Sequence, residues 1–306
     1  MSILSLGRAV GGAFFTLMAA SASAHPVSIP FDFSRGAIVI GVAVNGVPLR
    51  MFLDTGVDPS VIDENRAQAL GLKLDRALAG PVSGGGSTKP AVGIPTTITG
   101  LAVGGVRAAP IVAGAVDLTG ISHAYGGRID GVLGYNYLKD RIVLIDYPSS
   151  RLTIVDRRSE ATITTASCRR RWTTPLRLQT GYNTPLVMLH LGDAAAIATL
   201  DTGDNGVIEL YQSALDLPGV RAALIEAGKT RSTGFNGEAS HSQWTLNAPI
   251  GLGPFRLPSG ASAALGGPES SGAPGANVGN RLLAALRLKL LLDYRDREIG
   301  FYGDCR

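Results

Sequence analysis

The chain has 306 residues, of which 45% are hydrophobic and 17% are charged. This composition excludes a disordered chain and leaves room for two domains of ordinary size. The 40 glycines, against 8 Phe and 8 Tyr, indicate many tight turns and favour short strands over long helices. The formal net charge of +4 is too mild and too scattered for a nucleic-acid-binding surface, so no nucleic-acid partner is expected.

Residues 1–24 have the pattern of an export signal. Arg8 precedes an apolar run from Ala9 to Ala20, and Ala22-Ser23-Ala24 matches a cleavage site. A membrane anchor or a buried first strand are the alternatives, but the run is too short to span a bilayer. We therefore expect cleavage near Ala24, a periplasmic or secreted protein, and no stable membrane insertion. The short stretch from His25 to Arg35 leaves no room for an inhibitory propeptide before the first domain.

A hairpin opens each half of the chain. Gly36 to Asn45 reads as a strand, Asn45-Gly46 as its turn, and Leu49 to Leu53 as the returning strand. Leu186 to Leu200 repeats this pattern in the second half. A helical pattern follows each hairpin, at Pro59 to Leu72 and at Leu210 to Ala227, and Pro218-Gly219 splits the second helix into two short pieces.

A glycine-rich hairpin tip follows at residues 80–93, before strand patterns at Thr96 to Ala102 and Val106 to Val112. Each half closes with another hairpin. The first joins Ile142–Tyr147 to Arg151–Val155, and the second joins Leu288–Tyr294 to Glu298–Tyr302. We place a first lobe at residues 25–160, a solvated linker at 161–173 that holds Arg169-Arg170-Arg171, and a second lobe at 174–306.

The tripeptide Asp-Thr-Gly occurs twice, at Asp54-Thr55-Gly56 and at Asp201-Thr202-Gly203. Each copy ends an apolar run. An Asp-Tyr pair follows each copy at the same distance, as Asp146-Tyr147 and Asp293-Tyr294. A single Asp of this kind is more often a turn or helix-cap residue. Two copies at matched positions of an internal repeat instead indicate a pair of carboxylates that the fold brings together.

These motifs resemble the aspartic protease clan, and are most similar to bacterial retropepsin-type domains fused as two copies in one chain. The first copy contains "FLDTGVDPSVID" and "GVLGYNYLKDRIVLIDYPSSRLTIVD"; the second contains "TLDTGDNGVIEL" and "ANVGNRLLAALRLKLLLDYRDREIGFY". The resemblance covers about residues 36–303. It implies a mainly β fold, with two pseudo-two-fold-related retropepsin/pepsin-like β-barrel lobes and a few short helices.

The resemblance also implies the site. Asp54 and Asp201 would activate water as the catalytic pair, and the residues beside them, Thr55, Gly56, Thr202 and Gly203, would hold the two loops. Flaps over the cleft would come from the glycine-rich tip and from residues 232–244, with Gly84, Gly85, Gly86, Phe235 and Asn236 against the substrate. Neither flap contains Tyr, which favours the retropepsin-like form over the pepsin-like one.

Two close carboxylates can share one proton, because like charges at short range do not both ionise. The ionised member takes a proton from water while the protonated member donates to the scissile carbonyl. This chemistry requires no cofactor and no metal. The four histidines, His25, His123, His190 and His241, lack metal-binding spacing, and His190 reads as a structural residue of a strand.

Two residues depart from the pattern of the clan. Asp204 stands where Ser, Thr or Ala is usual, and Asn277 stands where an apolar residue is usual. We expect the Asp204 carboxylate either to raise a pKa in the dyad or to point away into solvent.

The two cysteines, Cys168 and Cys305, lie at the start and the end of the second repeat. In an exported protein this placement predicts a disulfide.

The sequence therefore predicts an exported, monomeric aspartic endopeptidase that acts on a peptide or protein substrate. The alternative is a catalytically silent peptide-binding protein with the same fold, which Asp204 and Asn277 favour. A two-carboxylate glycosidase fits less well, because its acids do not normally come from an exact sequence repeat.

Overall fold

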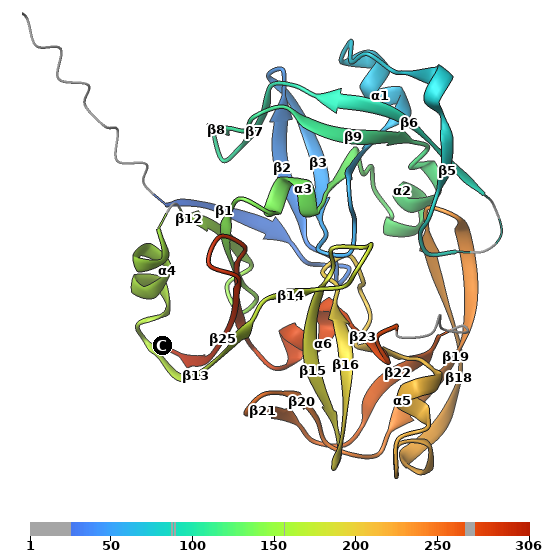
Figure 1. The fold of residues 1–306 in the computed structure, drawn as a ribbon, viewed down its shortest axis with the longest axis vertical. Helices are drawn as coiled ribbons and strands as arrows, with labels where there is room; N and C mark the ends of the chain where they lie inside the picture. Colours follow the sequence, from blue (N-terminus) through green and yellow to red (C-terminus); the bar gives the residue numbers. More distant parts are fainter. Residues whose placement is uncertain (1–25, 87, 89, 156, 267–272) are drawn as a thin grey trace, which may run out of the picture.

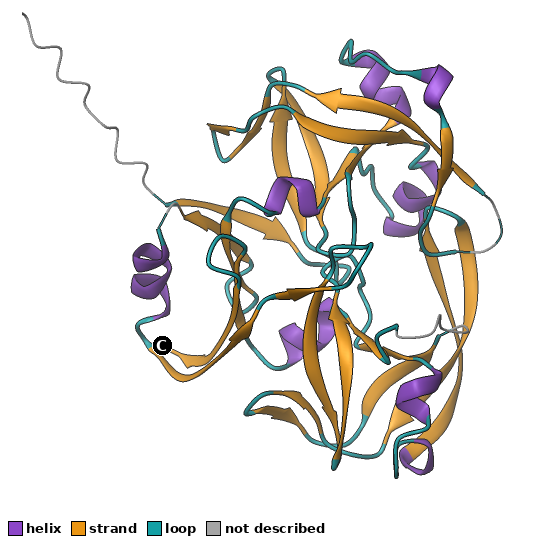
Figure 2. Ribbon diagram, viewed as in Figure 1, coloured by secondary structure: helices purple, strands orange, loops and turns teal. Residues whose placement is uncertain are grey.

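The computed structural model describes residues 26–86, 88, 90–155, 157–266 and 273–306. The predicted export signal at residues 1–24 lies outside the described residues. Strands dominate the two lobes, and the helices that connect the strands are short (Figures 1 and 2). Within the described ranges, no helix is long and apolar enough to cross a membrane.

A sheet built from both halves of the chain joins the lobes (Figure 1). Its strands, in spatial order, are β13 (Cys168–Pro175), β25 (Glu298–Cys305), β24 (Lys289–Asp293), β11 (Ile142–Asp146), β12 (Arg151–Val155) and β1 (Val27–Asp32). The closing hairpins of the two halves were predicted, and the structure confirms both. They meet where β11 pairs antiparallel with β24, so the junction between the lobes is a continuous backbone ladder.

In the first lobe this sheet continues from β1 into β2, whereas the second lobe builds a separate sheet; equivalent strands of the two lobes follow in the same order. In the first lobe the order is β2 (Val39–Val44), β3 (Val47–Leu53), β10 (Gly131–Leu133), β4 (Ser60–Asp63), β9 (Ile111–Val116), β6 (Ala91–Ile98) and β5 (Gly80–Val82). In the second lobe it is β15 (Pro185–Leu191), β16 (Ala194–Leu200), β23 (Ala276–Val278), β17 (Ile208–Leu210), β22 (Ala261–Leu265), β19 (Gly237–Leu246) and β18 (Leu224–Gly234).

Short strands extend these sheets, at β7 (Leu101–Val103), β8 (Val106–Arg107), β14 (Arg177–Leu178), β20 (Ile250–Leu252) and β21 (Phe255–Leu257). The α-helices are α1 (Glu64–Ala69), α2 (Thr119–Tyr125), α3 (Tyr135–Leu138), α4 (Arg158–Thr165), α5 (Gln212–Leu215) and α6 (Asn280–Ala285). Single 3₁₀ turns lie at Arg76–Leu78 and Arg221–Ala223.

The opening hairpins place the two motifs. Asn45 and Gly46 have the positive φ values of 52° and 80° that the tight turn between β2 and β3 requires. Strand β3 ends at the fully buried Leu53, and the next amide, of Asp54, donates to Leu133 O at 3.0 Å. In the second lobe the amide of Asp201 donates to Val278 O at 3.0 Å. Each Asp therefore leaves its strand beside the equivalent neighbouring strand, β10 in the first lobe and β23 in the second.

The helix predicted at Pro59–Leu72 is wrong in its first part. Ser60–Asp63 forms β4 because Val61 and Ile62, both β-branched and buried, pair with β10. The helix begins only at Glu64, where Asp63 accepts a capping hydrogen bond from Arg66 N. In the second half the two predicted short pieces are present, but Leu224 already begins β18.

The segment at 161–173 is not a solvated linker. Helix α4 occupies its first part, and β13 pairs with β25 along its second part, which completes the joint sheet. The predicted disulfide is confirmed: Cys168 and Cys305 lie directly opposite each other on these strands, with an S–S distance of 2.01 Å.

We predict that reducing this bond lowers the free energy of unfolding by up to about 4–5 kcal/mol, because the closed loop spans 137 residues. Urea unfolding with and without a thiol reductant measures the difference. A Cys168→Ala/Cys305→Ala variant is the control, and reductant should leave its midpoint unchanged. Equal midpoints for the wild type in both conditions would contradict the prediction.

Candidate active site

The two Asp-Thr-Gly loops are joined by reciprocal hydrogen bonds through their threonines. Thr55 N donates to Thr202 Oγ1 at 3.0 Å, and that hydroxyl donates onward to Leu53 O at 2.9 Å. In return Thr202 N donates to Thr55 Oγ1 at 3.0 Å, and that hydroxyl donates to Leu200 O at 2.5 Å. Both threonines are buried. Residues 147 apart in sequence are thus held in one fixed arrangement.

The glycines bring each loop against the opposite carboxylate. A Cβ atom added to Gly203 would lie 2.0 Å from Asp54 Oδ2, and one added to Gly56 would lie 2.8 Å from Asp201 Oδ1. Only glycine fits at these two positions. The amides of the same glycines orient the carboxylates, because Gly56 N donates to Asp54 Oδ1 at 2.7 Å and Gly203 N donates to Asp201 Oδ1 at 2.8 Å.

The surroundings of the two carboxyls favour a shared proton. Burial raises the pKa of Asp54. Burial, and then the negative charge of Asp54, raise the pKa of Asp201 well above the usual range. Both residues keep part of their surface exposed, so water can reach them. A pair in this setting holds one proton at a pH where two isolated aspartates would both be ionised.

The second loop has a support that the sequence analysis missed. The buried Asn280, first residue of α6, donates from Nδ2 to Thr202 O at 2.5 Å. Its Oδ1 accepts a hydrogen bond of 2.6 Å from Tyr147 Oη, which lies just beyond β11. The only feature of the sequence that could have indicated this contact is the polar residue that follows Val278-Gly279. Asn280 thus connects the dyad loop to the joint sheet.

The two departures from the pattern of the clan, Asp204 and Asn277, bind each other. Asn277 Nδ2 donates to Asp204 Oδ2 at 2.9 Å, and Gly206 N donates to Asp204 Oδ1 at 2.6 Å. Asn277 Oδ1 accepts from Thr199 Oγ1 at 2.5 Å. Burial, and then the charge of Asp201, raise the pKa of the Asp204 carboxyl to about 6. The charge of Asp204 also contributes to the raised pKa of Asp54, so the first of the two expectations for Asp204 holds.

The two predicted flap tips meet each other across the lobes. Asn236, between β18 and β19, donates from its amide to Gly85 O at 2.9 Å and from Nδ2 to Gly84 O at 3.0 Å. It accepts from Thr88 N at 3.1 Å and, at Oδ1, from Ala91 N at 3.0 Å. The neighbouring Phe235 lies against Gly84, where a Cβ atom would come within 2.7 Å of its ring. In Figure 1 these hairpins, beside β5 and at the end of β18 and β19, close one side of the molecule.

Gly86 also takes part in this contact, because a Cβ there would lie 2.2 Å from Gly237 O. The sequence patterns located both tips. They did not indicate that one asparagine supplies the bonds between them.

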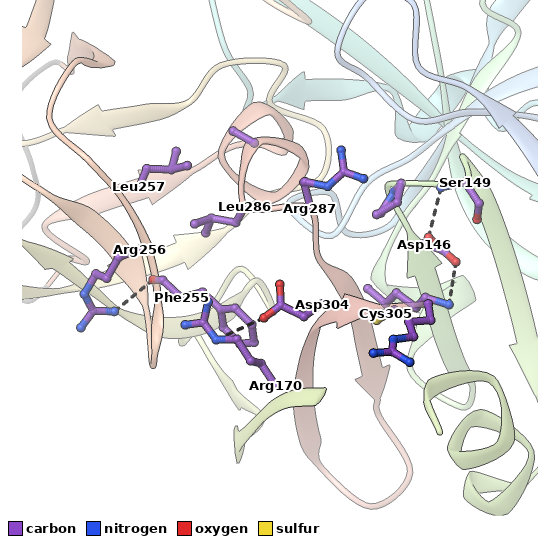
Figure 3. Close-up of a pocket in the computed structure, with 14 residues that line it drawn as sticks. Asp146, Ser149, Arg170, Phe255, Arg256, Leu257, Leu286, Arg287, Asp304 and Cys305 are labelled. Carbon is purple, nitrogen blue, oxygen red and sulfur yellow. Dashed lines mark hydrogen bonds and ion pairs between the residues drawn. The ribbon is translucent and has the colours of Figure 1, made fainter. Parts of the chain in front are cut away.

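A cavity of about 360 Å³ lies away from the dyad, around the end of the chain (Figure 3). Its lining includes no residue of the Asp-Thr-Gly loops or the flap tips. Two of its basic side chains face acids: Lys289 Nζ lies 3.0 Å from Asp146 Oδ2, and Arg170 Nε lies 4.0 Å from Asp304 Oδ2. We assign no chemistry to this cavity.

The described part of the chain contains no group of three or more His, Cys, Asp or Glu side chains placed to hold a metal ion. His190 lies half-buried in β15, where burial lowers its pKa.

We predict that Thr202→Val lowers the free energy of unfolding by about 2–5 kcal/mol, because it leaves Thr55 N and Leu53 O buried without partners. Thr202→Ser keeps the hydroxyl and is the matched control. Chemical denaturation of both variants measures the difference. A valine variant as stable as the serine variant would show that the hydroxyl does not join the loops.

Comparisons with known proteins agree with this geometry. Residues 40–137 match a family model described as aspartyl protease; this segment holds the first Asp-Thr-Gly loop and the first flap tip. A search of curated proteins finds no match.

Among solved structures, the crystal structure of Basic 7S globulin from soybean is similar, with a TM-score of 0.50 and 12% sequence identity. The match covers 92% of this chain and 95% of that chain. At this identity the likeness concerns the fold alone. The chain therefore has the two-lobed β fold of that globulin, with an aspartyl-protease-like segment in its first lobe.

Proposed function

We propose that this protein is an exported aspartic endopeptidase built from two copies of a retropepsin-like unit, with Asp54 and Asp201 as its catalytic pair. One observation carries the proposal: the threonine hydrogen bonds join the two loops, and the glycine of each loop lies against the carboxylate of the other. The aspartyl protease match of residues 40–137 supports it. The disulfide supports export, because such bonds persist in oxidising compartments.

In the proposed reaction the pair carries one proton. The ionised carboxylate takes a proton from a water molecule, which then attacks the scissile carbonyl carbon. The protonated carboxyl donates its proton toward the carbonyl oxygen, so charge does not accumulate in the tetrahedral intermediate. Thr55, Gly56, Thr202 and Gly203 act by holding the two carboxyls in place. The mechanism uses no cofactor.

The proposed substrate is an extended peptide that lies between the dyad and the flap tips. Its backbone would pair with the flap hairpins as an added strand. The contact residues proposed from the flaps are Gly84, Gly85, Gly86, Phe235 and Asn236. Because Asn236 bonds the tips together, we expect these bonds to break when a substrate enters and to re-form around it. The protein would work as a monomer, since one chain supplies both aspartates.

The second candidate is a peptide-binding protein that does not cut. The joined flap tips favour it, because four hydrogen bonds of Asn236 would retain a bound peptide. The next experiment separates these two functions.

We predict that the wild type cleaves a peptide library between pH 3 and pH 8, and that Asp54→Asn and Asp201→Asn each abolish cleavage. The amide is nearly isosteric but does not take a proton from water. Circular dichroism of each variant confirms that it is folded. A folded wild type that binds peptides and cuts none would favour the binding function, and normal cleavage by either variant would refute the dyad.

We predict that Asp204→Asn moves the alkaline limb of the kcat/KM profile to lower pH by up to about one unit. Asp204 is ionised above about pH 6, and its negative charge then hinders loss of the proton that the dyad shares. Removing the charge lets the dyad lose this proton at a lower pH. Asp193→Asn, at an exposed turn after β15, is the charge-matched control and should leave the profile unchanged. Coincident profiles for the wild type and Asp204→Asn would contradict the prediction.

A further inference from the structure

The sheet face of the first lobe beside the dyad is apolar. Phe52 on β3 lies opposite Val132 on β10, and Val132 lies opposite Val61 on β4. Val61 and Val132 are buried in one cluster with Ala91, Val116 and Leu118, and Phe52, Val57, Val82, Ile121 and Phe235 pack against it. The cluster therefore runs from the strand that delivers Asp54 to the flap tips.

The second lobe repeats this register with polar side chains. Thr199 on β16 lies opposite Asn277 on β23, and Asn277 lies opposite Glu209 on β17. These are the strand positions that Phe52, Val132 and Val61 occupy in the first lobe.

The residue after each Asp-Thr-Gly differs between the lobes in the same way, because it is the apolar Val57 in the first lobe and the acidic Asp204 in the second. A Cβ atom on Gly134 would lie 3.3 Å from Val57 Cγ1, whereas one on the equivalent Gly279 would lie 2.9 Å from Asp204 Oδ2. A carboxylate oxygen in the second lobe thus takes the place of a methyl group in the first.

The polar face of the second lobe, formed by Thr199, Asn277 and Glu209, also contacts the flap hairpin of that lobe. Tyr211 Oη donates to Glu209 Oε2 at 3.1 Å, and His241 Nδ1, on β19, lies 3.7 Å from Glu209 Oε1. The Glu209 side chain remains 24% exposed. The polar face carries two carboxylates, Asp204 and Glu209, and the His241 imidazole counters the charge of Glu209 when it is protonated. The charge of Arg281 acts on Asp204.

From this difference between the apolar first lobe and the polar second lobe we infer that the substrate has an apolar side chain on one side of the scissile bond and a cationic Lys or Arg side chain on the other. Asp204 and Glu209 select the cationic side chain. The inference rests on the proposed function for the position of the peptide. A scissile bond on the pseudo-two-fold axis presents its two flanking side chains to equivalent positions of the two lobes. One then meets Phe52 and Val57, the partly exposed residues that pack over the Val61–Val132 cluster, and the other meets Glu209 and Asp204. Partly buried carboxylates attract a cation more strongly than fully solvated ones do.

The test is made at about pH 7, where Asp204 is ionised, with peptides that differ only at the two residues flanking the cut and carry norleucine, Lys or Glu at each. We expect the wild type to prefer Lys over norleucine by about tenfold in kcat/KM at one flank, and norleucine over Lys at the other. Glu209→Gln keeps hydrogen-bonding groups and removes one charge, and it should reduce the Lys preference several-fold without changing the opposite flank. Asp193→Asn again controls for net charge.

The same peptides are titrated onto the Asp54→Asn variant, so that recognition is measured without cleavage. Tighter binding of the Lys peptides here, with no cleavage by the wild type, would refute the protease and keep the inference about recognition. Cleavage with an apolar preference at both flanks would keep the protease and overturn the inference. A Lys preference that is equal in the wild type and Glu209→Gln, and that Asp204→Asn also leaves unchanged, would overturn the assignment of these residues.

Discussion

The reciprocal hydrogen bonds between Thr55 and Thr202 are the constraint on which the arrangement of the site depends. Two carboxylates repel each other, and their burial adds a further free-energy cost, so other interactions must hold the loops that carry them together. A hydroxyl suits this task because it accepts from one backbone group and donates to another. The ladder between β11 and β24 fixes the lobes, and the threonines fix the loops.

The lobes share a topology and differ in the side chains around the dyad. In the second lobe Asn280 supports the loop and accepts the hydroxyl of Tyr147. In the first lobe the equivalent position is Tyr135, whose ring packs against Tyr294 at 5.9 Å. The buried hydroxyl of Tyr294 has no hydrogen-bond partner among the described residues. The two lobes thus share one backbone arrangement, but the polar contacts around the aspartate differ from one lobe to the other.

The sequence patterns sufficed for features that are local or repeated: the two hairpins that deliver Asp54 and Asp201, the closing hairpins, the flap tips and the disulfide. They failed at Val61 and Ile62, where pairing with β10 overrode a helical pattern. The Asp204–Asn277 pair was also missed, because each residue looked like a separate departure until the strand register placed them together. Glu209 and Asn236 acquire their roles only through contacts with β19 and with the opposite flap.

The most direct test of the central claim is a carboxyl ¹³C NMR titration of Asp54 and Asp201, with the Asp54→Asn and Asp201→Asn variants used for assignment. As the pH rises, a coupled pair loses its two protons in separate steps, and between these steps the two carboxyls share one proton. The second step falls at a pH well above the ordinary range for aspartate. In either variant the remaining carboxyl should then titrate in a single step. Simultaneous ionisation of both aspartates near the ordinary value of about 4 would contradict the account.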